Sequence, residues 1–420
     1  MVFLISMYGC ESWTVTKMGV SALEGDARSN TPEVPPAALA TAVLATRALG
    51  EMQTERLVPL ALPRGQKRWC ELCLGPATLR CGSCGVTYYC DIEHQRADWV
   101  SVHEKICQLL IPLRTSLPFY NSEKERKHGE EQKISREKFL AELTHAVAQN
   151  FLLEGKHEDA IPAALHSLKF IINVHGSNSV ELVPEYLVLA EASLGLGHLS
   201  QAEEYLSQAH WIVLKNSHCS SAIQSKLHRN LGLLHAAKGN FEDSLYHLAN
   251  DVYFACCAFG TNNVAASGGY FHMANVFFRQ NRMEVADSLY TEVTDIWHHH
   301  FSHLIDLQYY TLMTPVELDM LSEEEEPMEE ALDEKQRTEA SQMLNAILDI
   351  REQSARPQLA NIAKILHALA MFHYLILDVP KAHELVTKVR QITKKLPKYV
   401  PDESLHRLIR LMKSKPIYAK

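Results

Sequence analysis

The sequence lacks a long apolar run. In 420 residues, no stretch approaches the length of about 18 consecutive apolar side chains that marks a bilayer-spanning helix. The opening MVFLISMYGC is apolar, but it lacks the basic residues that begin a signal peptide. We therefore expect neither a signal peptide nor a membrane span.

Positive charge is also scarce. The chain has 41 Lys and Arg against 50 Asp and Glu, which gives a formal net charge of −9. Non-specific affinity for nucleic acid depends on many Lys and Arg contacts with phosphate. This balance argues against a general polyanion binder, and we expect no nucleic-acid partner.

Common enzyme motifs are missing as well. The sequence contains no P-loop, no GxSxG nucleophile motif and no convincing catalytic triad. With 46% apolar residues the chain can still bury a substantial core, with room for two or three domains. We expect a folded protein that is not an enzyme.

Cysteine is rare outside one short region. Six of the ten cysteines fall within 38 residues, and the other four are scattered without the spacing of a disulfide framework. The scattered cysteines are Cys10, Cys219, Cys256 and Cys257. Such clustering is typical of metal ligation in a reducing compartment.

The cysteine-rich region carries four pairs of metal-binding residues. Two CxxC pairs can each place two thiolates on one tight turn, and two pairs spaced by four residues can each share one face of a helical turn. The pairs are Cys70 with Cys73, Cys81 with Cys84, Cys90 with His94, and His103 with Cys107. Since Zn²⁺ takes four thiolate or imidazole ligands in a tetrahedron, these eight residues predict two structural Zn²⁺ ions.

His94 is the ligand for which the residues alone leave alternatives. The rival oxygen ligands nearby are Asp91, Glu93 and Asp98. Imidazole suits zinc in a thiolate-rich site better than carboxylate does, and only His94 keeps the spacing of four. The alternative is a surface histidine and a finger that binds a single zinc.

The ligand order, with TYYC before the fifth ligand and a Gln and a Trp after the sixth, resembles MYND-type zinc fingers. The resemblance implies a cross-brace, in which one metal takes the first and third pairs and the other takes the second and fourth. Two departures stand out. His94 replaces the usual sixth cysteine, and Trp99 precedes His103 by four residues where three is more common, a shift that a helix can absorb.

Three aromatic residues accompany the ligands. We expect Tyr88, Tyr89 and Trp99 to fill the small core that a domain of this size needs. The alternative, implied by the same resemblance, is a shallow groove for a proline-rich peptide.

From about residue 136 the chain repeats itself with a period of 42 residues. Each unit carries two small residues twelve positions apart, and in the second to fourth units a large residue follows the second small one by four positions. The small pairs are Ala148 with Ala160, Ala190 with Ala202, Gly232 with Ser244, and Ala274 with Ala286, and the large residues are Leu206, Leu248 and Tyr290. Because small residues let helix axes approach, each unit is expected to be two antiparallel helices joined by a short turn containing Gly or Asn.

Two later anchors extend the array. Ala340 and Ala382 are again 42 apart, but Ala340 follows Ala286 by 54 residues, which locates an insertion within the fifth unit. The acidic run at about 321–334 is the obvious insertion. The pattern resembles tetratricopeptide repeats, and its period resembles the longer repeats of kinesin light chains. Six such units are expected to form a curved superhelix whose concave face binds proteins.

The chain thus divides into three parts. Residues 1–62 combine a linker composition with a short Ala-rich stretch, so we expect a mostly disordered extension without chemistry. Residues 63–112 form the finger, and residues 136–400 form the repeats. The fold class is mainly α, with a small double-zinc finger ahead of a tetratricopeptide-like α-solenoid.

Two polar features have a less specific interpretation. Arg229 and Asn230 could line the concave groove, although ordinary surface polarity is the simpler account. The stretch WHHHFSH, residues 297–303, is expected to be a solvated helix end, since consecutive histidines point around a helix and do not converge on one metal.

Two families that join a MYND finger to tetratricopeptide-like helices imply different functions. In lysine methyltransferases the finger interrupts a SET domain, whose cofactor glycine motif and strand-rich flanks are missing here. Across residues 60–395, including DWVSVHEKICQLLIPLRTSLPFYNSE and YHLANDVYFACCAFGT, the chain more closely resembles a family of MYND-finger proteins of motile cilia. That resemblance implies a non-enzymatic adaptor in the cytoplasm and axoneme, especially that of the sperm flagellum. The implied partners are another tetratricopeptide-repeat axonemal protein and inner-arm dynein components. The alternatives are a MYND-dependent transcriptional corepressor adaptor and, after it, a divergent methyltransferase.

Overall fold

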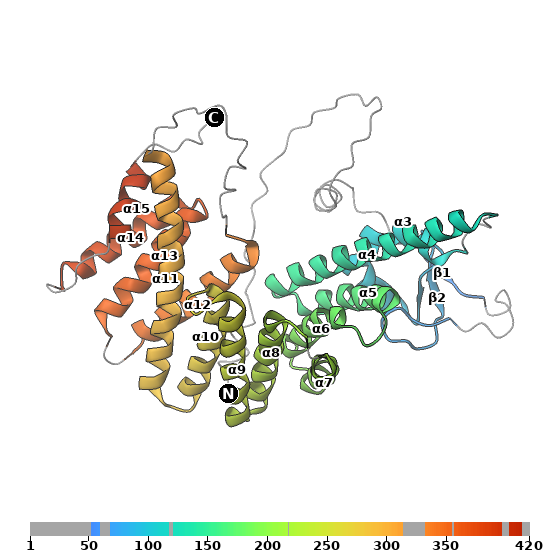
Figure 1. The fold of residues 1–420 in the computed structure, drawn as a ribbon, viewed down its shortest axis with the longest axis horizontal. Helices are drawn as coiled ribbons and strands as arrows, with labels where there is room; N and C mark the ends of the chain where they lie inside the picture. The colour runs from blue at the N-terminus through green and yellow to red at the C-terminus, as the bar shows by residue number, and fades with distance from the viewer. Residues whose placement is uncertain are drawn as a thin grey trace. The chain divides into compact units, whose positions relative to one another are not determined.

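The computed structural model describes residues 52–58, 68–116, 121–216, 218–313, 332–354, 357–396 and 403–413. The chain forms two compact units, residues 1–219 and 220–420. Most described residues in both units are helical, and a small sheet lies in the first unit (Figure 1). The fold class is therefore as predicted: mainly α, with a small cysteine-rich finger followed by helical hairpins.

The finger combines a small sheet with a bent helical segment. Its antiparallel strands have the order β1-β2-β3, and they are β1 (Thr54–Arg56), β2 (Leu79–Cys81) and β3 (Tyr88–Tyr89). The helical segment that follows consists of α2 (Ile92–Asp98), the π-helical turn η2 (Trp99–His103) and α3 (Glu104–Arg114).

Strand β1 lies upstream of the predicted finger boundary at residue 62. Its three residues are exposed and show no apolar alternation, so the sequence carries no strand signal there. The strand is defined by main-chain pairing with β2, in which Glu55 is opposite Arg80. The finger therefore includes a segment that was predicted to belong to the extension, whose residues 1–51 lie outside the described ranges.

Two helical hairpins complete the first unit. They are α4 (Glu123–Leu153) with α5 (His157–His175), and α6 (Val183–Gly195) with α7 (Leu199–Lys215); the 3₁₀ turn η3 (Val180–Leu182) leads into α6. Helix α4 begins well before residue 136, because Ser122 and Glu125 form a capping box at its N-terminus. That Ser-x-x-Glu signal is visible in the sequence and could have located the start.

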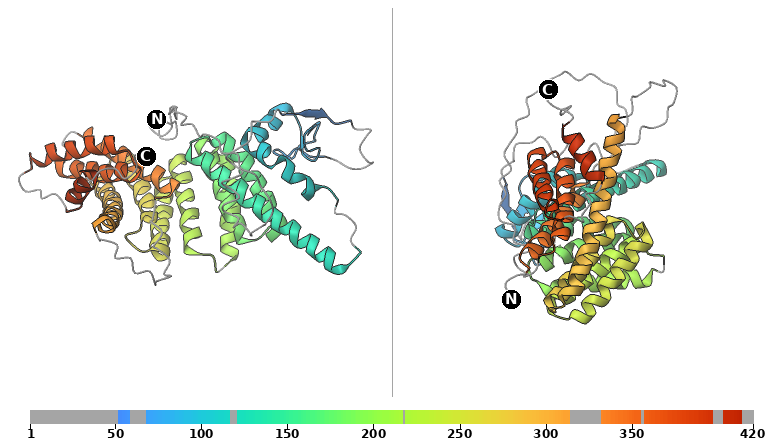
Figure 2. Two further views of the ribbon diagram at one scale, coloured as in Figure 1. Left: turned by 90° about the horizontal axis from the view of Figure 1, so that it is seen from above. Right: turned by 90° about the vertical axis from the view of Figure 1, so that its left-hand side faces the viewer.

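The second unit continues the same pattern. Its helices are α8 (Ser221–Lys238), α9 (Phe241–Phe259), α10 (Val264–Arg279), α11 (Met283–Met313), α12 (Glu334–Glu352), α13 (Leu359–Leu375), α14 (Val379–Thr393) and α15 (Glu403–Lys413). The hairpins are α8 with α9, α10 with α11, and α13 with α14. Figure 2 shows α8 to α10, in olive to yellow, standing side by side as successive layers.

The fifth repeat departs from the others. Helix α11 continues to Met313 as one helix of 31 residues, and Ala340 lies on α12. The predicted acidic insertion at 321–334 lies outside the described residues except for its last three.

The small residues that define the repeat are buried. The six anchors, Ala160, Ala202, Ser244, Ala286, Ala340 and Ala382, are each at most 1% exposed. At Gly232 the fit is tight, because a Cβ atom there would lie 2.7 Å from Cγ of Leu248 on the paired helix. Small side chains therefore set the distance between the helices of a hairpin.

The turn inside each hairpin repeats with the same period. A residue with positive φ lies five positions before each anchor except Ala340, and these residues are Gly155, Gly197, Gly239, Asn281 and Leu377. The amide that follows each of them donates to a carbonyl five residues earlier, as from Lys156 to Phe151 and from Asp378 to His373. This is the Schellman arrangement that ends a helix, so the predicted Gly or Asn turn is present in four hairpins and Leu377 adopts it in the last.

The finger and the first hairpin share one hydrophobic core. Val102, Ile106 and Leu110 of the finger pack with residues of α4, α5 and α6, including Leu140 and Phe170. The finger is thus built onto the first repeat within its unit. Within the described part of the chain, no helix combines the length and apolarity needed to cross a bilayer.

Candidate metal centres

The structure gathers the eight predicted ligands into two groups of four. One group is Cys70, Cys73, Cys90 and His94, and the other is Cys81, Cys84, His103 and Cys107. Within each group the potential ligand atoms all lie within 4.8 Å of one another. Each group takes alternate pairs along the chain, which is the cross-braced arrangement that the resemblance implied.

The distances within the groups suit tetrahedral zinc. Zn–S and Zn–N bonds of about 2.3 and 2.0 Å require ligand–ligand edges of about 3.5 to 3.8 Å. In the first group, Cys73 Sγ lies 3.6 Å from Cys90 Sγ, and Cys70 Sγ lies 3.5 Å from His94 Nδ1. The 2.9 Å separation of Cys90 Sγ and His94 Nδ1 is shorter than such an edge and has to open slightly around a metal.

The second group has similar dimensions. Cys81 Sγ lies 3.9 Å from Cys107 Sγ, and Cys84 Sγ lies 3.7 Å from His103 Nε2. Its three cysteines are free, and the sulfur separation is far beyond the disulfide bond length of about 2.05 Å. Both donor sets therefore fit one Zn²⁺ ion each, and the finger fits two.

A π-helical turn positions the second group's histidine. In η2 the amide of Glu104 donates to the carbonyl of Trp99, five residues earlier. Such a turn accommodates one extra residue within a helix. It absorbs the additional residue between Trp99 and His103, as expected, and allows His103 to face the cysteines.

The first group is partly open to solvent, and Asp91 organises its edge. Asp91 caps α2 by accepting a hydrogen bond from the amide of His94, at 2.8 Å. Cys73 is exposed, and the amide of Gly75 donates to its sulfur and lowers the pKa of this thiol. A lowered thiol pKa favours the thiolate form that binds metal.

The second group is buried. His103 is fully inaccessible, and hydrogen bonding from Cys107 lowers the pKa of Cys84. Thr87 lies 2.8 Å from the sulfur of Cys84. This closed environment is typical of a structural zinc site, which has four protein ligands and no open coordination position.

Asp98 lies behind His103 and connects it to the first repeat. The carboxylate is fully buried, with Oδ2 3.6 Å from His103 Nδ1 and Oδ1 2.8 Å from His166 Nε2 on α5. The hydroxyl of Tyr89 donates to Oδ2 at 2.6 Å. Burial alone raises the pKa of Asp98, but the charge and hydrogen bond of His166 and the charge of His103 outweigh it and lower the pKa.

The grouping of side chains favours His94 among the predicted alternatives for the first site. Asp91 caps α2 and Asp98 lies beside the second group, whereas His94 is the residue that the structure groups with Cys70, Cys73 and Cys90. From the sequence, Asp98 was considered only as a rival ligand. Its true position depends on α5, which is distant in the sequence and gives no local signal.

The aromatic residues of the finger are divided between core and surface. Tyr89 is fully buried, as expected, and Trp99 is half-buried against the cysteine cluster. Tyr88 instead lines a surface pocket with Trp69, which is 50% exposed. The guanidinium of Arg68 lies 4.8 Å from the centre of the Tyr88 ring.

Arg229 and Asn230 lie on α8 in the second unit, and Arg229 is partly buried. Arg229 Nε donates to Asp251 at 2.8 Å, and its Nη2 donates to the carbonyl of Ala265 at 2.7 Å. Asn230 is buried. Arg229 therefore ties α8 to α9 and α10, a structural role that the sequence did not predict.

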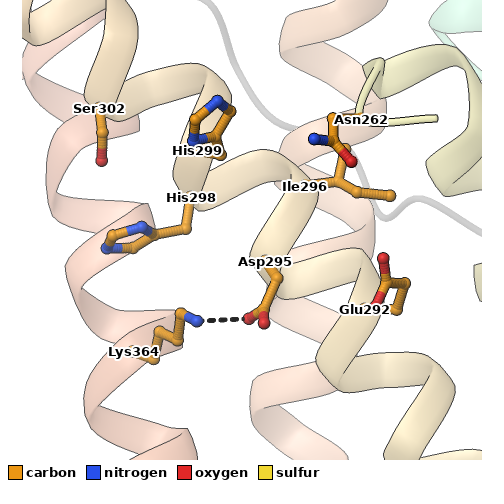
Figure 3. A pocket seen from close by; sticks show the side chains of 8 residues that line it. All are labelled: Asn262, Glu292, Asp295, Ile296, His298, His299, Ser302 and Lys364. Atoms are coloured by element: carbon orange, nitrogen blue, oxygen red, sulfur yellow. Dashed lines mark ion pairs between the residues drawn. The ribbon is translucent and has the colours of Figure 1, made fainter. Parts of the chain in front are cut away.

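The histidine-rich stretch 297–303 lies inside α11, and the prediction of a solvated helix end is wrong. His298 is buried, with its Nε2 2.9 Å from Nδ1 of His367 on α13. It lines a pocket together with an ion pair between Asp295 and Lys364 (Figure 3). Packing of α11 against α13 buries this face, which the local sequence could not show. Among the described residues, three or more potential metal ligands meet only in the two finger groups.

Comparison with known families supports the finger assignment. The family model of the MYND finger matches residues 70–107, the span that begins and ends with predicted ligands. This segment is therefore a MYND finger, and it occupies a small part of the chain.

The chain also has weak similarity to solved structures. A crystal structure of BtubC (BKLC) from P. vanneervenii is 15% identical and covers 62% of this chain and 94% of its own, with a TM-score of 0.29. A Podosopora anserina putative kinesin light chain with nearly identical TPR-like repeats is 15% identical and covers 62% and 99%, with a TM-score of 0.30. The repeat architecture of this chain is established by its own hairpins, buried anchors and turns.

Proposed function

We propose that this protein is a non-enzymatic adaptor of the axoneme of motile cilia, above all the sperm flagellum. It binds proteins through the concave face that repeats of this kind form, with the finger as a rigid second contact. One observation carries the adaptor role: two four-ligand sets brace a finger whose core is continuous with the first helical hairpin. Such an arrangement stabilises a shape on which partners can dock.

The surface of the finger supports a role in binding a protein partner. The pocket lined by Trp69 and Tyr88 also includes Val86 and two arginines, Arg68 and Arg114. Aromatic and arginine side chains are enriched where protein interfaces gain most of their affinity. The pocket therefore offers the finger a face for a partner.

The axonemal part of the proposal rests on resemblance. Over residues 60 to 395 the sequence resembles the vertebrate zinc finger MYND domain-containing protein 12. That resemblance supports a place beside another tetratricopeptide-repeat axonemal protein and inner-arm dynein components. The first sixty residues lie outside it.

Proximity labelling with the full chain in testis tests this role. Axonemal proteins, including dynein components, are expected to be enriched over a labelling enzyme expressed alone. A matched Trp69→Ala chain separates partners of the finger, whose labelling should fall, from partners of the repeats. Chromatin factors without axonemal proteins would instead favour the corepressor alternative. Binding of S-adenosylmethionine in calorimetry would favour the methyltransferase.

A further inference from the structure

Helix α9 of the second unit presents an uncharged face to solvent. Two large aromatic side chains lie on this face, Tyr246 at 66% and Tyr253 at 62% exposed. Beyond Asp243 the only Asp, Glu, Lys or Arg of the helix is Asp251, which is fully buried and pairs with Arg229. About four turns of helix therefore meet solvent without a charged side chain. Exposed apolar patches of this kind mark interaction sites.

The exposed face repeats every seven residues and alternates large with small side chains. Tyr246 and Tyr253 are seven residues apart, and so are Ala249, which is exposed, and Cys256, which is partly buried. Along the chain these four positions are separated by steps of three, four and three. This is the spacing of the a and d positions of a coiled coil, with tyrosine at each a and a small residue at each d. We call these four residues the α9 seam.

The α9 seam is complementary in shape to a second copy of itself. When two helices pair antiparallel, an a position of one packs against a d position of the other. Tyr253 then fills the space beside Ala249 of the second copy, and Tyr246 fills the space beside Cys256. Both contacts are centred on position 251, so a single register satisfies the whole seam. A parallel pair would instead place each tyrosine against its own equivalent.

The charge and size of the face also favour a second copy. The chain has a formal net charge of −9, so self-association through a charged face would bring like charges together. The residues beside the seam are uncharged as well, and they are Leu245, Asn250, Val252 and Cys257. With roughly 150 Å² from each tyrosine and the flanking residues added, one copy buries on the order of 500 Å². That area is typical of a weak, reversible interface.

We propose that the outer face of α9 is a homodimer interface, in which α9 pairs antiparallel with α9 of a second copy about a two-fold axis at position 251. Such a contact uses the same surface on both copies and closes after two chains. The dimer carries two fingers and two arrays of repeats. It therefore holds a partner with repeated binding sites more tightly than one copy does. This inference goes beyond the proposed function and does not depend on the axonemal assignment.

Sedimentation of the reduced, zinc-loaded full chain between about 1 and 200 µM tests the proposal. The unaltered chain should pass from monomer to dimer within this range. Tyr253→Glu should weaken the dimer by about 100-fold, because each of its two copies costs about tenfold. Leu214→Glu is the matched control, since it places the same charge at a leucine of α7 that is 68% exposed, and it should leave the dimer unchanged. Circular dichroism and zinc content should be equal in the three chains.

A cysteine trap tests the register independently. Under mild oxidation, Tyr246→Cys should form a disulfide with Cys256 of the second copy, which peptide mapping identifies. Within one helix these positions are about 15 Å apart, beyond the reach of a disulfide. A chain that stays monomeric to 200 µM, or equal dimerisation of Tyr253→Glu and the unaltered chain, would overturn the proposal. So would weakening by Leu214→Glu, or a trap that links only the two introduced cysteines.

Discussion

The finger and the helical repeats reach a stable fold by different means. The finger's own core consists largely of cysteines with Tyr89, and its eight potential ligands form two groups of four. The repeats bury a large apolar cluster, and their spacing is set by small residues such as Gly232. A domain of about forty residues has too little apolar surface to fold alone, whereas a helical array gains core with each added unit. We therefore expect the finger to need bound metal in order to fold, and the repeats to fold through side-chain packing.

Removal of zinc is expected to have the largest effect. Structural zinc sites contribute on the order of 10 kcal/mol each to folding, so a chelator should unfold the finger. Hydrogen exchange of the reduced chain should then show unprotected amides in 68–114, while α8 to α10 and α13 stay protected. Finger amides that stay protected without metal, or a loss of protection in the second unit, would contradict this difference between the two regions.

Asp98→Ala tests the junction between the two regions. The substitution removes the charge that pairs with His166 and lies behind His103. Breaking a buried pair costs about 3–5 kcal/mol, and loss of a partner behind a metal ligand typically weakens metal binding by about 10–100-fold. Competition with a zinc indicator and urea unfolding measure the two effects. Asp91→Ala, at the first site, serves as the control and should leave the affinity of the second site unchanged.

Gly232→Val tests packing in the repeats. The added side chain meets Leu248, and overpacking of this kind costs about 1–3 kcal/mol. Thermal unfolding of the second unit should shift downwards, with both zincs retained. Ala237→Val, at an exposed position of the same helix, makes a matched control for helix propensity. A loss of zinc in Gly232→Val would show that the two regions are not independent in the way described.

Acid is expected to lower the stability of the repeats by a smaller amount than these substitutions do. Burial and the charge of His298 lower the pKa of His367 to about 3, against an ordinary value of 6.5. Between these values the unfolded chain takes up a proton that the folded chain does not, so stability falls as the pH falls below 6.5. At pH 5.5 the loss is about 1.4 kcal/mol from this residue. Urea unfolding at pH 7.5 and 5.5 should show a smaller difference in His367→Asn than in the unaltered chain.

Much of the architecture could be predicted because its signals are local or periodic. CxxC turns and pairs spaced by four place ligands without knowledge of distant segments, and the 42-residue period places the anchors and turns of most hairpins. The turn at Leu377 shows the limit of composition. A leucine there adopts the positive φ that Gly or Asn adopts in the other hairpins, so the period locates the turn and the residue type does not.

The features that could not be predicted from the sequence depend on contacts between segments that are distant along the chain. Strand β1 has no apolar pattern and is defined by pairing with β2, which lies more than twenty residues later. Asp98 takes its role from His166, and His298 is buried because α13 packs against α11. Each was missed or misinterpreted because a local pattern does not report what another helix will cover.

The count of zinc per chain tests the central claim most directly. Elemental analysis of the purified full chain should give two zinc ions, and His94→Ala should give one, because the first group then has only three ligands. His128→Ala, a histidine on the exposed part of α4, should keep two. One zinc in the unaltered chain, or two retained in His94→Ala, would contradict the account of two interleaved Cys₃His sites.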